Sequence, residues 1–498
     1  SSWETTAADF TKVSLTPGAD DTELNFAWYS EKTDSQATPV VHFGTDKDNL
    51  ETFEGTSGDV DQDLTGDKAY EYNHVTVTGL EPNTTYYYTV EKNGEQTEVT
   101  EYTTKGMDTV KILYVGDPQV GASKGQTQDG AELSAEDGAA NTAAKNDGFA
   151  WSRTLDTALA ENPDLNFVIS AGDQVNKTGK PKEEEYASYL SAEALTSLPV
   201  ATTIGNHDSL NPDYAYHFNN PNNTENGKTA AGGDYYYSYG EGLFIVLNTN
   251  NYNVAEHQNT IEEAVKAYPD AKWRIVTIHQ DIYGSAEHSN EPEITNLRYS
   301  LVPIFEANDI DIVLTGHDHA YSRSKLLKGG QSTYEYTDDE FDEMLDKDID
   351  AGEDPETRYE APANIKNDTT DPAEQKYLEY LYSVMDDSAV EELTDGQDVA
   401  VNPEGIMYLT AGSSSGSKYY DLVPRQQTYI ASRWQQDVPT YSVIDVTETS
   451  LTLNTYRTDT DEKIDSQFMI VKSADHSQLS ALIEEAESLK ADDYTASS

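Results

Sequence analysis

The chain has 498 residues, which is enough for roughly three domains of ordinary size. Its 32 Lys and Arg residues stand against 91 Asp and Glu residues, and the resulting net charge of −59 repels nucleic acid and anionic membranes. Without cysteine the chain can form neither disulfides nor thiolate metal sites. No apolar run approaches the roughly 18 residues that a membrane-spanning helix needs, so we expect no membrane span.

The first part of the chain, residues 1–105, is predicted to be an all-β domain. Short β-branched or alternating runs recur there, and turn residues such as Pro17-Gly18 and Lys92-Asn93-Gly94 separate them. Regular short strands of this kind are typical of a β-sandwich. The stretch from His74 to Val90 resembles the late strands of a fibronectin type III domain, in which a Leu–Pro corner precedes a Tyr-bearing strand.

Residues 106–475 are predicted to form a layered α/β domain, because apolar strands alternate there with helical patterns. The helical patterns lie near Gly148–Glu161, Glu183–Ser197, His257–Ala267 and Glu293–Ala307. In the last of these, Ile294, Leu297 and Leu301 form a stripe that should face the core.

An acidic stretch at about 331–400 interrupts the α/β domain, and apolar strands resume after it at Gly405–Ala411. We interpret this stretch as a surface insertion that is helical at Glu374–Met385. Within it, the run Asp346–Asp350 lacks the Gly and the Glu of a calcium-binding loop. We therefore predict that this run is solvated.

Five polar motifs follow apolar, β-branched runs of the α/β domain. They are Gly116-Asp117-Pro118-Gln119, Gly172-Asp173-Gln174-Val175-Asn176, Gly205-Asn206-His207-Asp208, His279, and Gly316-His317-Asp318-His319. Each motif therefore begins where a buried strand should end, and sites in open α/β sheets form outside the carboxyl ends of strands. One motif alone is a common turn or helix cap. Together they indicate a two-metal centre, and such centres hydrolyse phosphate esters.

Two metal ions about 3.5–4 Å apart need a bridging anion and further hard or borderline ligands. Carboxylates, amide oxygens and imidazoles suit Zn, Mn or Fe. We take Asp173 as the bridging carboxylate. The six predicted ligands are Asp117, Asp173, Asn206, His279, His317 and His319.

These motifs resemble those of calcineurin-like metallophosphoesterases, and more narrowly those of purple acid phosphatases. That group also carries an N-terminal fibronectin-like domain, and its last motif reads Gly-His-x-His-x-Tyr-x-Arg, which here is Gly316 to Arg323. The resemblance covers most of residues 8–325 and the strands after 405. It implies an α/β (α+β layered) metallophosphoesterase sandwich preceded by an all-β fibronectin-like sandwich.

The resemblance also implies a role for each motif residue. One divalent metal would be held by Asp117, Asp173 and His319, and the other by Asp173, Asn206, His279 and His317. His207, beside the Asn ligand, and His288, nine positions after His279, would be catalytic proton donors. The Ser-rich loop Ala411–Tyr420 follows a predicted strand, and it either lines the cleft or is a plain surface loop.

Two positions depart from the pattern of the family. Purple acid phosphatases place a Tyr four residues after the Gly of the second motif, and its phenolate on Fe(III) gives the colour. Here Asn176 takes that place, so we expect neither Fe(III) nor colour. The first motif of the superfamily is often Asp-x-His, whereas this chain has Gln119. Gln119 either offers its carbonyl oxygen to the first metal or only hydrogen-bonds nearby.

The resemblance implies hydrolysis of the monoester of a phosphorylated small molecule by a metal-bound hydroxide. The alternative within enzymes is a phosphodiesterase or nucleotidase that acts on nucleotides or wall polymers. The alternative of another class is a non-catalytic surface-binding protein that keeps the fold. The presence of all six ligands argues against this last alternative.

From residue 476 to 498 the sequence changes character. Leu479–Leu489 followed by Asp492-Asp493-Tyr494-Thr495 resembles the opening helix of the FIVAR-type repeat found in wall-attached proteins of Gram-positive bacteria. We therefore expect an extracellular or cell-wall-associated protein of a Gram-positive bacterium, attached through a further C-terminal region. The strongly acidic composition agrees with export.

Overall fold

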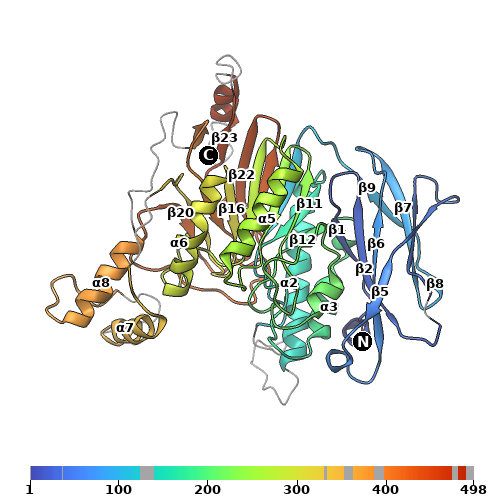
Figure 1. Ribbon diagram of the computed structural model, residues 1–498, viewed down its shortest axis with the longest axis horizontal. Helices are drawn as coiled ribbons and strands as arrows, with labels where there is room; N and C mark the ends of the chain where they lie inside the picture. Colours follow the sequence, from blue (N-terminus) through green and yellow to red (C-terminus); the bar gives the residue numbers. More distant parts are fainter. Residues whose placement is uncertain are drawn as a thin grey trace.

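The computed structural model describes residues 2–35, 37–123, 139–329, 334–352, 363–385, 398–473 and 481–489. An all-β domain lies at one end of the long axis of the molecule, and two helices of the acidic insertion lie at the other (Figure 1). The layered α/β domain stands between them. The fold class predicted from the sequence is therefore confirmed.

The N-terminal domain is a sandwich of two antiparallel sheets that follows helix α1 (Ser2–Ala8). One sheet has the order β1 (Ser14–Pro17), β2 (Leu24–Glu31), β6 (Tyr70–Val77) and β5 (Thr56–Asp59). The other contains β4 (Glu51–Glu54), β3 (Val40–Gly44), β7 (Thr85–Lys92), β8 (Glu95–Gln96) and β9 (Thr100–Thr103). Phe26, Trp28, Phe43 and Tyr88 fill the space between the sheets, because alternate residues of each strand point inward.

The α/β domain contains two seven-stranded sheets. The first has the order β12 (Val200–Thr202), β11 (Phe167–Ser170), β10 (Val110–Val115), β21 (Thr440–Val446), β22 (Ser450–Arg457), β23 (Phe468–Val471) and β18 (Val399–Val401). The second has the order β13 (Tyr235–Tyr239), β14 (Gly242–Val246), β15 (Trp273–Thr277), β16 (Ile312–Thr315), β19 (Met407–Thr410), β17 (Tyr321–Ser324) and β20 (Ile430–Trp434).

The two sheets pack face to face, and helices cover their outer faces. Strand β10 shows why: Ile112 and Tyr114 belong to the cluster between the sheets, while Leu113 and Val115 belong to the cluster outside. Helices α2 (Ala139–Glu161) and α3 (Glu183–Leu190) cover the first sheet, and α5 (Val254–Ala267) and α6 (Pro292–Ala307) cover the second. The predicted stripe of α6 does face this core, since Ile294, Leu297 and Leu301 are all buried.

The two domains meet at a buried polar interface formed by β2, β7, α3, the 3₁₀ turn Glu193–Thr196 and α4 (Asp213–His217). The ring of Tyr29 stacks on the imidazole of His217 with centroids 4.2 Å apart. The Tyr29 hydroxyl donates to Glu183 Oε1 (3.1 Å), and the His217 ring contacts the other oxygen of the same carboxylate (2.7 Å). Tyr88 donates to the carbonyl of Thr196 (2.6 Å).

The acidic insertion forms two helices, α7 (Asp338–Asp350) and α8 (Pro372–Val384). The sequence predicted α8 but not α7, whose start is marked by a capping box between Thr337 and Glu340. The prediction that Asp346–Asp350 is a solvated run was wrong at Asp348, which is buried. Its carboxylate accepts hydrogen bonds from the main-chain N–H of Asn364 and Ile365 (2.8 and 2.7 Å) and from the Tyr377 hydroxyl (3.0 Å).

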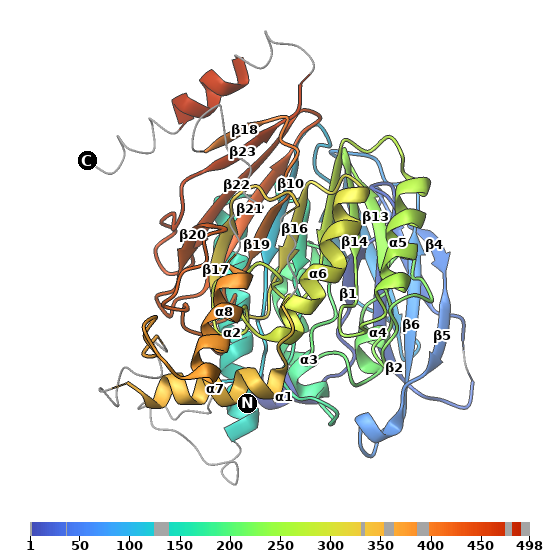
Figure 2. The same ribbon diagram turned by 60° about the vertical axis from the view of Figure 1, so that its left-hand side comes forward.

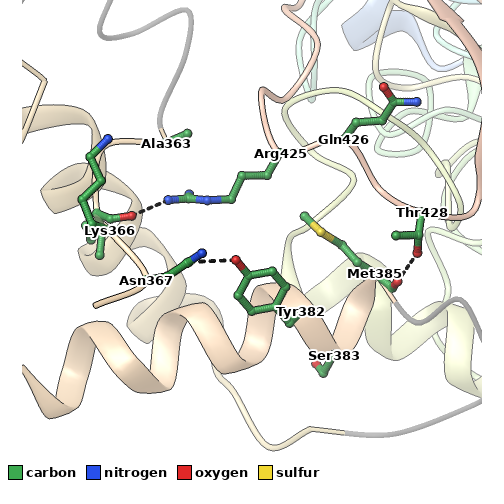
Figure 3. A pocket seen from close by; sticks show the side chains of 10 residues that line it. Ala363, Lys366, Asn367, Tyr382, Ser383, Met385, Arg425, Gln426 and Thr428 are labelled. Atoms are coloured by element: carbon green, nitrogen blue, oxygen red, sulfur yellow. Dashed lines mark hydrogen bonds between the residues drawn. The ribbon is translucent and has the colours of Figure 1, made fainter. Parts of the chain in front are cut away.

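Arg425 provides the positive charge that Asp348 needs. Its guanidinium lies 2.9 Å from Asp348 Oδ2 and also donates to the carbonyl of Ile365 (2.7 Å). The close-up shows this side chain extending from its loop across a cavity of about 770 Å³ to the insertion (Figure 3). Arg425 therefore fixes the insertion against the loop between β19 and β20.

The C-terminal segment adds a helix at residues 481–489, next to β18 and β23 (Figure 2). Its Ala486 is buried against Val399, Met469 and Val471 of those strands. This part of the segment therefore packs on the α/β domain.

Replacing Arg425 by Ala should loosen the insertion. Removing one partner of a buried ion pair leaves the other charge uncompensated, which costs about 3 kcal/mol at the low end of the usual range. We expect protease cleavage within α7 or α8 to become about 100-fold faster under native conditions, since cleavage follows the population of the open form. Arg457→Ala, which removes a pairing with Asp459 near the surface, is the control and should change cleavage little. Equal cleavage rates in both variants would contradict the role assigned to Arg425.

Candidate metal centre

All five polar motifs lie at the carboxyl ends of parallel strands, as predicted. Asp117, Asp173 and Asn206 follow β10, β11 and β12 of the first sheet, which run parallel to one another. His279 and the pair His317 and His319 follow β15 and β16 of the second sheet, which are also parallel. The centre therefore lies where the carboxyl ends of the two packed sheets meet.

The backbone at the centre is unusual. Asp117, Asp173, His317 and His319 have positive φ angles of 46°, 53°, 75° and 53°. This left-handed conformation costs non-glycine residues about 1–3 kcal/mol each, and it persists only where surrounding contacts impose it. It turns each chain sharply at the end of its strand, so that side chains from separate strands reach the same point.

Asp208 helps to hold the loops of the centre in this backbone conformation. Its buried carboxylate accepts hydrogen bonds from the main-chain N–H groups of Asp173 (2.8 Å), Gly205 (2.8 Å) and Gln174 (3.1 Å). Burial and the charge of Asp173 raise its pKa to about 6. Asp208 thereby ties the loop that carries Asp173 to the loop that carries Asn206.

Two glycines permit the close approach of the ligand loops. A Cβ on Gly172, whose φ is 108°, would lie 2.6 Å from His279 Nδ1. A Cβ on Gly316 would lie 2.6 Å from Asp117 Oδ2. Larger residues at these positions would push the side chains of the centre apart.

Two groups of side chains at the centre could each hold a metal ion. One group is Asp117, Asp173 and His319, and the other is Asp173, His279 and His317; within each, the potential ligand atoms lie within 4.8 Å of one another. Asp173 belongs to both. Asn206 adjoins the second group, because its Oδ1 lies 3.0 Å from His279 Nε2. All six predicted ligands are therefore brought together.

Main-chain carbonyls fix the orientation of two imidazoles. His279 Nδ1 lies 2.8 Å from the carbonyl oxygen of Ala171, and His319 Nδ1 lies 2.7 Å from that of Lys418. With Nδ1 engaged by a carbonyl, Nε2 is in each case the nitrogen that faces the cluster. His279 Nε2 is 3.2 Å from Asp173 Oδ2, and His319 Nε2 is 3.6 Å from Asp117 Oδ1.

The electrostatics of the centre fit a bound cation. Asp117 Oδ1 is buried and has no hydrogen-bond partner among the described residues. Burial raises the pKa of Asp117 well above its usual value, whereas the surrounding histidines outweigh burial at Asp173 and lower its pKa. Burial also lowers the pKa of His319 to about 4, so its imidazole is neutral, the form that binds metals. An unpaired buried carboxylate oxygen beside neutral imidazole is the donor set that a metal ion would satisfy.

His207 and Gln119 lie at one side of the cluster. The His207 main-chain N–H donates to Asp173 Oδ1 (2.9 Å), and its Nδ1 contacts the carbonyl of Asn176. Gln119 donates from its amide nitrogen to Asn176 Oδ1 (3.0 Å), and the same nitrogen lies 3.3 Å from His207 Nε2. Gln119 thus hydrogen-bonds beside the cluster, and ligation through its carbonyl oxygen stays a prediction.

His288 lies at another side. Its ring stacks on that of His317, with centroids 4.4 Å apart, and its Nδ1 is 2.6 Å from Glu291 Oε1. Burial alone would lower its pKa, but the hydrogen bond to Glu291 and the charge of Asp318 raise it to about 9. The structure therefore places His288, with its raised pKa, beside the predicted ligand His317.

The loop Ala411–Tyr420 lines the centre, which decides between the two alternatives for it. Ser413 and Ser417 donate to the carbonyls of Asp117 (3.3 Å) and Pro118 (3.1 Å). The ring of Tyr420 lies 4.9 Å from the rings of both His288 and His319. Sequence reasoning offered this loop as one that could line the cleft but gave Tyr420 no contact of its own, and it missed the role of Asp208.

The comparison with known families agrees with this geometry. Residues 110–321 match the calcineurin-like phosphoesterase family, and residues 10–104 match the N-terminal domain of purple acid phosphatases. The chain therefore carries a calcineurin-like metallophosphoesterase domain behind a purple acid phosphatase N-terminal domain. The resemblance to this family noted in the sequence is confirmed.

Solved structures show the same fold. Purple acid phosphatase PPD1 from yellow lupin seeds aligns over 94% of this chain and 74% of its own, with a TM-score of 0.65 and 15% identity. PhoD aligns over 97% of both chains with a TM-score of 0.51 and 11% identity. An uncharacterized protein of Mycobacterium tuberculosis is 23% identical over 337 residues, and the match spans 63% of this chain and 61% of that protein. The match thus spans less than two thirds of the length of this relative.

Within the part of the chain that the structure describes, no helix has the length and apolar character needed to cross a bilayer.

Changing Asp208 to Asn should weaken metal binding without touching a predicted ligand. The new NH₂ group faces main-chain N–H donors, so the loops that carry Asp173 and Asn206 lose a shared acceptor. Partners that orient ligands usually contribute about 10–100-fold in metal affinity. Titration calorimetry with Zn²⁺ or Mn²⁺ measures this loss, and Asp164→Asn, at an exposed carboxylate, is the control. An unchanged affinity in Asp208→Asn would show that the loops hold their positions without it.

Proposed function

We propose that the metallophosphoesterase domain hydrolyses phosphate monoesters with the help of two divalent metal ions. The observation that supports this most is the position of Asp173, whose carboxylate belongs to both groups of potential ligands. A shared carboxylate between two cation sites is the arrangement of two-metal phosphoesterases.

Asp117, Asp173 and His319 would hold one ion, and Asp173, Asn206, His279 and His317 would hold the other. Zn, Mn and Fe suit this set of oxygen and imidazole ligands. When bound, the two ions supply a Lewis acid for the phosphoryl oxygens and a nucleophile at neutral pH. Asn176 donates to the carbonyl of Gly121 (3.3 Å) and accepts from Gln119, so a colourless protein stays our prediction.

The protein side chains would handle the leaving-group proton. His207 is held by the carbonyl of Asn176 and by Asp173, and His288 is held by Glu291. The carbonyl of Asn176 engages Nδ1 of His207 and the Glu291 carboxylate engages Nδ1 of His288. Nε2 is therefore the nitrogen that would serve a substrate, and in His207 it lies 3.3 Å from the Gln119 amide nitrogen. A proton delivered to the ester oxygen stabilises the departing alcohol.

The choice between monoesters and diesters needs a direct test. Chromogenic mono- and diesters should be compared after addition of Zn²⁺, Mn²⁺ or Fe²⁺, alongside elemental analysis of the protein. We expect higher kcat/KM for the monoester. Faster diester cleavage would make the protein a phosphodiesterase or nucleotidase, and metal binding without turnover would support a non-catalytic surface-binding protein.

We further propose that the protein is exported and lies outside the cell or on the cell wall of a Gram-positive bacterium. The net charge of −59 and the resemblance of Leu479–Leu489 to a wall-protein repeat support this. Its substrate would be a phosphorylated small molecule that reaches the cell surface. Fractionation of the source bacterium tests the location, and a protein found only in the cytoplasm would contradict it.

Asp173→Asn should remove most activity and at least one metal ion, because a neutral amide cannot balance two cations. Turnover of a chromogenic monoester and the metal content of the purified variant are measured together. Near-normal turnover with two ions still bound would refute the bridging role of Asp173.

His207→Ala should lower kcat by about 10²–10⁴-fold while both metals stay bound, since a positioned proton donor contributes about that factor. The loss should shrink for esters with good leaving groups, which depart without a proton. His288→Ala should behave in the same way. Loss of a metal in either variant would make that histidine a ligand, and equal losses for good and poor leaving groups would point to phosphoryl binding.

A further inference from the structure

A second cavity, of about 260 Å³, lies between the acidic insertion and the loops beside the metal centre. On the insertion side its wall is one face of α7, formed by Phe341, Leu345 and Ile349 at a spacing of four residues. Tyr377 and Leu381 of α8 continue this wall. The cavity therefore has an apolar surface, although the insertion as a whole is acidic.

The opposite wall belongs to the loop that follows Tyr420. Leu422, Val423 and Pro424 face the same cavity. The side chains of Leu345, Ile349, Leu422 and Val423 are only half-buried, so apolar surface on both walls is open to a ligand. Arg425, which is paired with Asp348, also lines this cavity. The same side chain lines the neighbouring cavity shown in Figure 3, so it lies between the two cavities.

The cavity lies next to the residues that flank the metal centre. Ala286 and Leu422 form an antiparallel bridge, and the Val423 N–H donates to the carbonyl of Ser285 (3.0 Å). Two residues beyond this bridge, the paired chain segments carry His288 and Tyr420, whose ring centroids lie 4.9 Å apart. The residues between, Glu287 and Asp421, line the cavity themselves. A molecule whose phosphate lies at the metal centre would meet this cavity past His288 and Tyr420.

Size and charge restrict the occupant. An apolar cavity of about 150 Å³ binds benzene, so 260 Å³ accommodates a substituted ring or a short alkyl chain. The guanidinium of Arg425 is neutralised by its ion pair with Asp348, so the carboxylates of Glu287 and Asp421 at the lining disfavour a second anionic group, such as another phosphate or an acid. An uncharged apolar group is therefore the occupant that is compatible with both apolar walls and with these carboxylates.

We propose that this cavity is a subsite for an apolar aromatic or alkyl group on the alcohol side of the phosphate ester. The inference rests on the proposed phosphatase function and narrows its substrate class. Each methylene buried there increases binding about fourfold. The metallophosphoesterase domain should therefore prefer esters of apolar alcohols to esters of sugars or of further phosphorylated compounds.

The test compares phenyl phosphate with 4-butylphenyl phosphate, whose leaving groups have similar acidity. Wild-type protein should show kcat/KM at least about tenfold higher for the butylated ester. Leu345→Trp, which fills the cavity, should bring this ratio close to one, chiefly by lowering kcat/KM for the butylated ester. Asp342→Trp, on the exposed side of the same helix, is the matched control and should keep the wild-type ratio. If Leu345→Trp does not fold, Ile349→Trp takes its place.

A second readout does not depend on catalysis. Binding of 4-butylphenol, the uncharged product, is measured by calorimetry on the metal-free protein, and it should saturate in wild type and in Asp342→Trp but vanish in Leu345→Trp. Wild-type protein could hydrolyse phenyl phosphate, show a kcat/KM ratio near one for the two esters and fail to bind 4-butylphenol. This result would overturn the subsite and leave the phosphatase proposal standing. Alternatively, wild-type protein could bind 4-butylphenol, lose this binding in Leu345→Trp and hydrolyse neither ester. This result would support the subsite and refute the phosphatase proposal. A wild-type ratio retained in the filled variant would also overturn the subsite.

Discussion

The candidate metal centre depends on one buried carboxylate that belongs to neither group of potential ligands. Asp208 accepts the main-chain N–H groups of Asp173, Gly205 and Gln174, and so joins two loops that would otherwise end their strands independently. The positive φ of Asp173 is tolerated because its N–H has this partner. That hydrogen bond helps to position the carboxylate of Asp173, which belongs to both groups of potential ligands.

Much of this centre could be predicted because the residues that form it stand directly beside recognisable strands in the sequence. Each motif stands directly after a β-branched run, and a parallel strand delivers whatever follows it to the same edge of the sheet. The positions of Asp117, Asp173 and Asn206 therefore followed from three runs of apolar residues. The stripe on α6 followed in the same way, since helical periodicity is a property of one short segment.

The features that the sequence did not predict depend on contacts between residues that are distant in the sequence. Asp348 looked like part of a solvated acidic run, because Arg425, which balances its charge, comes 77 residues later. Tyr420 and the serines of its loop contact the centre only because β19 lies beside β16. The environment of Gln119 was undetermined because it depends on Asn176, which belongs to another strand end. Pairings of this kind are set by the packing of the two sheets.

The interface between the two domains has a consequence for cooperativity. Glu183 is fully buried, and its two oxygens are served by Tyr29 from the N-terminal sandwich and by His217 from the metallophosphoesterase domain. Separating the domains would expose the stacked face of His217 and take one hydrogen-bond donor from a buried carboxylate, which is costly. The boundary near residue 105 thus separates two structural domains that form a single cooperative folding unit. The two domains should melt in a single transition, because the N-terminal sandwich holds α3 and α4 of the metallophosphoesterase domain in place.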